Sequence, residues 1–320
     1  MESQDIEENS SFILHPSSLD SGKRLDAFLS EKIEGWSRSR LQRLIDDGDV
    51  SVNEAAVKSS YKLRAADSVE IELTELPAKS YAPENIPLEI IYEDDALAVI
   101  NKPAGMVVHP GAGVLNGTLA NAIAFHFKLQ TADSKFENRV GIVHRLDKDT
   151  SGLIVVAKTE EIHERLSEQF REREVFKSYV TLVHGEMAGN AGTIDQPIAR
   201  EKHNRTRIAI RKHGRNALSL WKLRKRFEKF TLLNVEIKTG RTHQIRVHLM
   251  SINHPVVGDE TYNSGRDKTV KDKNVRQAII ELNRFFLHAE RLSFTHPKTL
   301  EKMDFYVPLP KELADFLELI

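Results

Sequence analysis

The segment "GIVHRLDKDTSGLIVVAKT", residues 141–159, places a histidine, an arginine and two aspartates between two apolar stretches typical of β-strands. Asp147 lies in the middle of this charged patch. A carboxylate in a loop on a rigid scaffold suits a nucleophile or a base. Two alternatives stay open: Asp147 and Asp149 cap backbone N–H groups in a surface turn, or His144 and Asp147 bind a metal ion.

A second segment, "TGRTHQIRVHL", carries arginines and histidines directly after an expected strand. Gly240 is placed to turn the chain from this strand into a helix, and His243 and Arg246 are three residues apart, so they share a helix face. An arginine that faces inward needs an acidic partner, because a buried unpaired guanidinium is very costly. Asp147 would suit Arg246 as that partner.

Other polar residues of these segments have ordinary alternatives. Arg241 and His248 also fit a solvated or RNA-facing helix surface. In "FKSYVTLVHG", residues 176–185, Tyr179 lies on one strand face with Lys177. A lone tyrosine on such a face is also compatible with a ring packed in the core and a hydroxyl at the rim.

Charge is spread unevenly along the 320 residues, although the net charge is only -1. Between Arg200 and Lys229 there are twelve basic residues against two acidic ones, Glu201 and Glu228. Such a local positive field favours contact with phosphates. The chain has no cysteine, which excludes disulfides and thiolate zinc sites and predicts a cytoplasmic protein.

The elements that must position these groups follow from periodicity. The pattern predicts a helix near residues 25–33, a second helix capped by Ser37, and a helix over residues 160–172. The run "GLIVVAKT" predicts a central buried strand. Hairpins outnumber strand–helix alternations, so we expect an α+β fold with a mostly antiparallel sheet flanked by helices, plus a small N-terminal α/β domain.

Composition divides the chain into four parts. We expect a disordered acidic tail over residues 1–11, a small domain over 12–75, a proline-containing linker over 76–86, and a large domain over 87–320. The acidic start is neither a secretory signal nor a transit peptide, and no apolar run is long enough to span a bilayer. We therefore expect no membrane partner.

Taken together, the chain resembles the RluA family of pseudouridine synthases. The resemblance covers about residues 85–310 and is closest to members that act on large-subunit ribosomal RNA. Residues 20–74 resemble the S4 RNA-binding domain. The motifs that carry the main resemblance are "NKPAGMVVHPG", "GTLANAI", "GIVHRLDKDTSGL", "FKSYVTLVHG", "TGRTHQIRVHL", "HPVVGDETY" and "LHAERLSFTHP".

The resemblance implies a reaction without a cofactor or a metal. The N-glycosidic bond of a uridine in RNA is cut, the uracil rotates, and it is rejoined through C5. It implies that the partner is large-subunit rRNA or an assembling large ribosomal subunit. We expect a monomer, although the sequence carries no signal for the oligomeric state.

The resemblance also assigns roles to residues. Asp147 matches the essential aspartate, Arg246 the arginine that pairs with it, and Tyr179 the tyrosine near the flipped base. Arg145 matches the residue that fills the gap left by the extruded nucleotide. Further RNA-binding or loop-supporting contacts are expected from His144, Arg241, Thr242 and His243, and nonspecific RNA affinity of the small domain from Arg38, Arg40 and Arg43.

Three competing interpretations remain. The first is a catalytically dead RNA-binding protein. The second is a metal-dependent hydrolase that uses His109, His144 and Asp147. The third stays within the family and is a synthase acting on tRNA or on another rRNA site.

Overall fold

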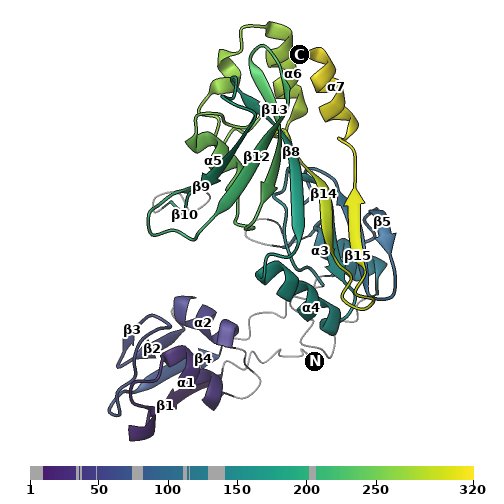
Figure 1. Cartoon of the computed structure of the whole chain (residues 1–320). Coiled ribbons are helices and arrows are strands. Elements are labelled where there is room, and N and C mark those ends of the chain that lie inside the picture. Colours follow the sequence, from purple (N-terminus) through teal and green to yellow (C-terminus); the bar gives the residue numbers. More distant parts are fainter. Residues whose placement is uncertain are drawn as a thin grey trace, which may run out of the picture. The chain divides into compact units, whose positions relative to one another are not determined.

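The chain folds into two units, residues 1–79 and residues 80–320, in the computed structural model (Figure 1). The structure describes residues 10–33, 36, 38–47, 49–73, 82–110, 114, 116–128, 141–201 and 207–320. The predicted acidic tail therefore lies almost wholly outside the described residues. Its last two residues are an exception, because the first strand begins at Ser10.

The small unit contains a four-stranded antiparallel sheet with strand order β1-β4-β2-β3. Two helices pack against each other, and their apolar residues share one core with the sheet, as the sequence predicts. The proposed cap Ser37 lies outside the described residues. The elements are β1 (Ser10–Leu14), η1 (Ser18–Asp20), α1 (Leu25–Lys32), α2 (Arg38–Asp47), β2 (Val50–Val52), β3 (Ala55–Ala56) and β4 (Val69–Leu73).

The large unit is built on a nine-stranded sheet of order β5-β6-β7-β14-β8-β13-β12-β9, with β15 paired to β14. The expected α+β class with a mostly antiparallel sheet is confirmed. The strands are β5 (Glu89–Glu93), β6 (Leu97–Lys102), β7 (Ser151–Ala157), β8 (Phe176–His184), β9 (Ala191–Asp195), β12 (Leu218–Arg226), β13 (Phe230–Ile237), β14 (Leu287–Thr295) and β15 (Lys302–Tyr306), beside a two-stranded sheet of β10 (Ile198–Arg200) and β11 (Ile208–Ile210).

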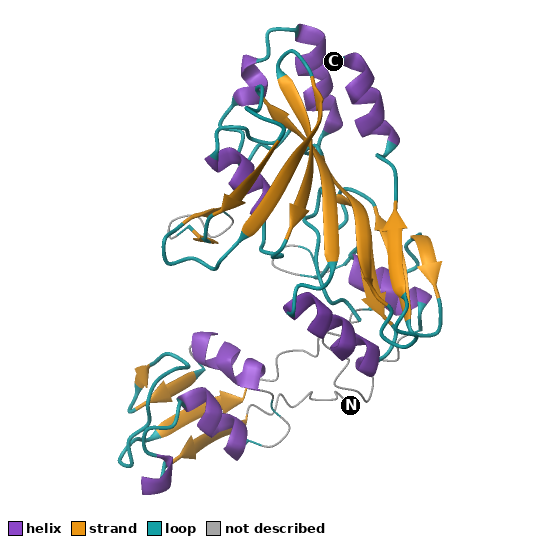
Figure 2. Ribbon diagram, viewed as in Figure 1, coloured by secondary structure: helices purple, strands orange, loops and turns teal. Residues whose placement is uncertain are grey.

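Helices flank this sheet in Figure 2. On one face, α3 and α5 share a core with Tyr179 and Val183 of β8, while on the other, α6 and α7 pack with Val180 and Leu182. Strand β8 is therefore buried on both faces from Lys177 to His184. The helices are α3 (Leu119–His126), α4 (Glu160–Arg171), α5 (Gln244–Ser251), η3 (Arg266–Thr269), α6 (Lys273–Leu282) and α7 (Lys311–Leu319).

One pairing of the large sheet, β7 with β14, is parallel, and it joins two otherwise antiparallel halves. We call this contact the seam; it consists of Ser151 opposite His288 and Gly152 opposite Ala289. Gly152 has φ +113°, and a Cβ there would lie 2.3 Å from the Ala289 carbonyl oxygen. Only glycine fits this backbone conformation and this close approach. The "TSGL" glycine therefore brings the loop that precedes β7 against β14.

The predicted linker and the structure differ at the linker's C-terminal end. Residues 82–86 contact α3 of the large unit: the Ala82 carbonyl accepts a hydrogen bond from the Asn121 side chain at 2.9 Å, and the Ile86 carbonyl lies 2.8 Å from His126 Nε2. The stretch 74–81 lies outside the described residues. These contacts fit a boundary near residue 80 better than one at residue 87.

Candidate active site

Asp147 lies in the short loop that leads into β7. The loop closes on itself through a hydrogen bond of 3.1 Å from the Thr150 N–H to the Asp147 carbonyl. Lys102 also holds this loop in place. Its buried ammonium donates hydrogen bonds to the carbonyl of Lys148 at 3.0 Å and to the carbonyls of Pro103 and Met106. The main chain around Asp147 is therefore held without use of the Asp147 carboxylate.

The Asp147 carboxylate accepts a hydrogen bond from Arg246 Nη1 on α5 at 3.2 Å. The contact expected from the sequence is thus present. The described hydrogen bond of the Asp147 carboxylate goes to a guanidinium and not to a backbone N–H, as turn capping would require. The Asp147 side chain is 15% exposed, whereas that of Arg246 is 6% exposed. The pair therefore reaches the surface at its carboxylate end.

Arg246 has a second acidic partner that the sequence interpretation missed. Asp259 accepts from Arg246 Nε at 2.6 Å and from Nη2 at 2.8 Å. Burial opposes the charge of Arg246, but the Asp259 and Asp147 contacts outweigh it and raise the Arg246 pKa. The guanidinium also lies 4.2 Å from the Phe285 ring centroid and 4.9 Å from that of Tyr262. Because Asp259 accepts hydrogen bonds from Nε and Nη2, the Nη1 group of the guanidinium is left to bind Asp147.

Asp259 lies in "HPVVGDETY", one of the segments of the resemblance, and that position was the available signal. Its Oδ1 also accepts from the Thr261 and Tyr262 N–H groups at 3.1 and 3.2 Å. The side chain is therefore fixed by its own turn before it binds the guanidinium.

Tyr179 is placed in the middle of β8, between Val235 of β13 and Ala289 of β14. It is 6% exposed and lines the same pocket as Asp147 and Arg246. Burial, and then the charge of Asp147, raises the Tyr179 pKa. The phenol is therefore neutral at physiological pH, so it can pack as an uncharged ring and donate a hydrogen bond.

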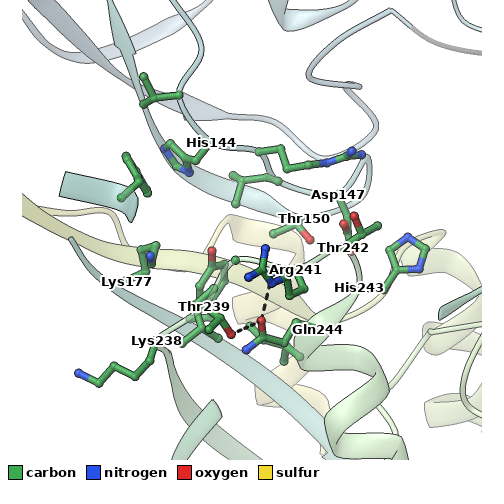
Figure 3. A pocket seen from close by; sticks show the side chains of 18 of the residues that line it. His144, Asp147, Thr150, Lys177, Lys238, Thr239, Arg241, Thr242, His243 and Gln244 are labelled. Atoms are coloured by element: carbon green, nitrogen blue, oxygen red, sulfur yellow. Dashed lines mark hydrogen bonds between the residues drawn. The ribbon is translucent and has the colours of Figure 1, made fainter. Parts of the chain in front are cut away.

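The three predicted catalytic residues line one pocket of about 640 Å³. This volume lies in the range of small-molecule sites. Among the described residues that line it, Asp147 is the sole carboxylate, while the cations are Arg145, Arg171, Arg173, Lys177, Lys238, Arg241 and Arg246. Figure 3 shows Asp147 and His243 toward one end of the pocket and Lys177 and Lys238 toward the other.

His144 supports the loop. Its Nε2 accepts a hydrogen bond of 3.0 Å from the Val155 N–H, and its ring stacks on Phe170 with centroids 4.6 Å apart. Burial, followed by the charge of Lys177, lowers the His144 pKa to about 3. The ring is therefore neutral, with its Nε2 lone pair used by the backbone.

The turn between β13 and α5 places the other predicted RNA contacts at the pocket. Arg241 is exposed, and Thr242 and His243 are half-buried. His243 has φ +54° and lies 2.8 Å from the Tyr262 hydroxyl, and burial lowers its pKa. Arg145 is also exposed at the pocket rim. RNA binding by these residues stays a prediction.

Gln244 was missed by the sequence interpretation, and it holds this turn. Its side-chain oxygen accepts from the Thr239 hydroxyl at 2.7 Å and from the Arg241 N–H at 3.1 Å. Its amide group donates to the Leu218 carbonyl at 3.0 Å. His248, for which a solvated or RNA-facing position was an alternative, is instead buried between Ser219 and the Gln196 carbonyl.

In the small unit, Arg38 is engaged in an internal ion pair. Its Nη2 lies 2.9 Å from Asp26, which also accepts hydrogen bonds from Arg24 and Gln42. The side chain of Arg38 is half exposed. The side chains of Arg40 and Arg43 lie outside the described residues, so RNA contact by all three arginines stays a prediction.

The metal-dependent alternative finds no matching cluster in the described part of the chain. No group of three His, Asp or Glu side chains there is arranged to hold a metal ion. The proposed ligand His144 uses its Nε2 for a backbone hydrogen bond. No helix in these residues combines the length and the apolar character needed to cross a membrane.

Comparison with known proteins decides the family. A family model of RNA pseudouridylate synthases matches residues 96–251, and an S4 domain model matches residues 23–69. An uncharacterized RNA pseudouridine synthase, YlyB of Bacillus subtilis, is 41% identical over 296 residues, which are 92% of this chain and 93% of that protein. This chain belongs to the RNA pseudouridylate synthase family.

A further relative carries a more specific name. The ribosomal large subunit pseudouridine synthase D of Nitrosomonas europaea is 42% identical over 300 residues, or 93% of this chain and 85% of that protein. Among solved structures, human RNA pseudouridylate synthase domain containing 1 superimposes with a TM-score of 0.55 at 24% identity, covering 73% of this chain and 89% of that one. That similarity supports the fold of the synthase family.

Proposed function

We propose that this enzyme isomerises specific uridines of large-subunit rRNA to pseudouridine. The relatives named for the large ribosomal subunit support the substrate class. One geometric observation carries the proposal: the Asp147 carboxylate reaches an open pocket beside Tyr179 while Arg246 binds one of its oxygens.

The proposed reaction is balanced within the nucleotide. The bond between C1′ and N1 breaks, the uracil rotates, and a bond forms between C1′ and C5. The C5 proton is lost and N1 gains a proton, so no external group is consumed. The protein must therefore supply charge, position and proton transfer.

The Asp147 carboxylate supplies the negative charge. It does so whether it attacks the nucleotide or stabilises a glycal-like intermediate. Arg246 Nη1 donates to Oδ2 only, so Oδ1 is free of that contact and can face the substrate. Tyr179, as a neutral phenol, can pack on the uracil and donate a hydrogen bond to the nucleotide.

Access requires the uridine to leave its stack. Flipping costs a few kcal/mol and is least costly in a loop. The exposed guanidinium of Arg145 stands at the rim of the pocket, where we expect it to fill the place of the extruded nucleotide. The other pocket cations can offset the cost through phosphate contacts.

The test replaces Asp147 by Asn. We expect release of tritium from RNA labelled at uridine C5 to fall by at least about 1,000-fold, because the reacting carboxylate is lost, while RNA affinity is nearly unchanged. Asp149→Asn, two residues away in the same loop, is the matched control and should stay within several-fold of the wild type. Full turnover by the Asp147 variant would refute the assignment.

The substrate is tested separately. Pseudouridine positions are mapped in rRNA and tRNA from cells with and without this protein. We expect loss at one or more positions of large-subunit rRNA. Loss in tRNA alone would favour the competing synthase of the same family.

A further inference from the structure

Lys177 is a buried cation that takes no part in the proposed bond-breaking and bond-forming steps. It lies on β8, lines the pocket, and is 6% exposed. Its ammonium lies 5.1 Å from the Phe170 ring centroid. Among the described residues, the contact found for the Lys177 ammonium is this ring, and its Nζ is not one of the buried polar atoms that are sealed from solvent without a partner.

An ammonium in this position lacks the counter-charge that buried charges normally have. Burial, and then the nearby Lys238, lowers the Lys177 pKa to about 8. The group is still mostly protonated at neutral pH, so it stays a cation at the wall of the pocket. The ring of Phe170 offsets only part of the lost hydration.

The position of Lys177 relative to the reacting end of the pocket suits the length of a nucleotide. Lys177 and Tyr179 are two residues apart on one strand, so their side chains leave the same face about 7 Å from each other. Figure 3 shows Lys177 at the end of the pocket opposite Asp147. Lys177 is therefore within reach of the backbone of a nucleotide whose uracil and ribose are held at Asp147 and Tyr179 and whose phosphate points along β8.

We propose that the Lys177 ammonium binds a phosphodiester oxygen of the RNA backbone next to the flipped uridine. A phosphate supplies the charge that the protein lacks here, and a charge-assisted hydrogen bond to it is stronger than one to a uracil carbonyl. The proposal rests on the proposed function, because it takes the orientation of the nucleotide from Asp147 and Tyr179.

The experiment compares full-length wild type, K177M, K177R and K302M. Lys302 is an exposed lysine of β15 outside the pocket, so K302M removes the same charge at a distance. In vitro transcribed large-subunit rRNA is the probe. Single-turnover pseudouridine formation and filter binding are measured over a series of KCl concentrations, and melting temperatures are recorded.

For K177M we expect a half-saturating RNA concentration about 10-fold higher, a salt slope smaller in magnitude by about 0.7, and a rate at saturating RNA within about twofold of the wild type. K177R should restore the slope, and K302M should leave it unchanged. The melting temperature of K177M should equal or exceed that of the wild type, because a buried unpaired charge is removed.

Two results would overturn the proposal. One is a K177M slope equal to that of the wild type. The other is a K177M melting temperature below that of the wild type together with a K177R salt slope that does not return to the wild-type value. That combination would indicate that Lys177 has a structural role. If the wild type forms no pseudouridine in the transcript, the proposed function fails by itself, and the filter-binding slopes still decide the role of Lys177.

Discussion

Replacing Asp259 by Asn isolates the anchor of the active-site arginine. The substitution keeps the size and one acceptor oxygen of Asp259 but places an NH₂ group opposite a guanidinium donor. Arg246 then retains Asp147 as its acidic partner, through one hydrogen bond of 3.2 Å. We expect Asp259→Asn to cost far more stability than any change at Asp147.

The magnitude follows from burial. Breaking a buried pair costs about 3–5 kcal/mol, and the remaining Asp147 contact and the retained amide oxygen place Asp259→Asn near 3 kcal/mol. Asp147→Asn removes one longer contact of a partly exposed carboxylate, for which about 1 kcal/mol is expected. In a unit of this size, 1 kcal/mol shifts the melting temperature by about 2–4 °C, so the expected losses are about 6–12 °C and 2–4 °C.

The assay is differential scanning calorimetry of the full-length wild type and both variants, with tritium release measured in parallel. Asp147→Asn should lose activity at small cost in stability. Asp259→Asn should lose stability and, through the disordered guanidinium, part of its activity. A melting temperature of Asp259→Asn that is no lower than that of Asp147→Asn would show that Asp259 is not the anchor of Arg246. It would also show that the more buried carboxylate does not contribute more to stability.

Two further predictions concern acid stability and RNA capture. Because the folded-state pKa of His144 is about 3 against 6.5 in the unfolded chain, its stabilisation is complete above pH 6.5 and decreases as the pH falls toward 3. Between pH 7 and pH 5 the wild type should therefore lose about 2 kcal/mol more than His144→Asn in urea titrations; equal losses would contradict a neutral His144. Deleting residues 1–74 should raise the half-saturating RNA concentration more than it slows the single-turnover rate, since we expect the S4 domain to add RNA affinity, whereas the described residues that line the pocket belong to the large unit. A slower rate with an unchanged half-saturating concentration would refute this prediction.

The contact between Arg246 and Asp147 was predictable from the residue types, whereas the catalytic roles of Asp147, Tyr179 and Arg246 came from the family resemblance and stay a prediction. An inward arginine on an amphipathic helix demands an acid, and Asp147 was the acid that the motifs offered. Local sequence could not show that Asp259 binds the same guanidinium twice, since that depends on how the turn after α5 folds back. The spacing of the motif indicates that Arg246 needs an acidic partner, but it does not indicate how many partners there are.

Side-chain direction was the weaker part of the prediction. His144 and His248 are of a residue type that often contacts RNA. In the structure, however, His144 accepts a hydrogen bond from a backbone N–H, and His248 is buried between Ser219 and Gln196. For Lys177 the sequence indicated only a strand face shared with Tyr179, and alternation alone does not show whether that face is buried. The burial of β8 on both faces, which turns Lys177 toward the pocket, comes from its place at the centre of the sheet.

The seam between β7 and β14 also constrains when the enzyme becomes active during synthesis. Asp147 lies in the loop before β7, in the half of the sheet made first, whereas Tyr179 lies on β8 of the other half and Arg246 on α5, which packs against that half. Strand β14, which pairs with both β7 and β8, is made late, at Leu287–Thr295. A nascent chain that has not yet extended past this strand lacks the pairing that joins β7 to β8, so we expect it to hold Asp147 and Tyr179 apart and to be inactive.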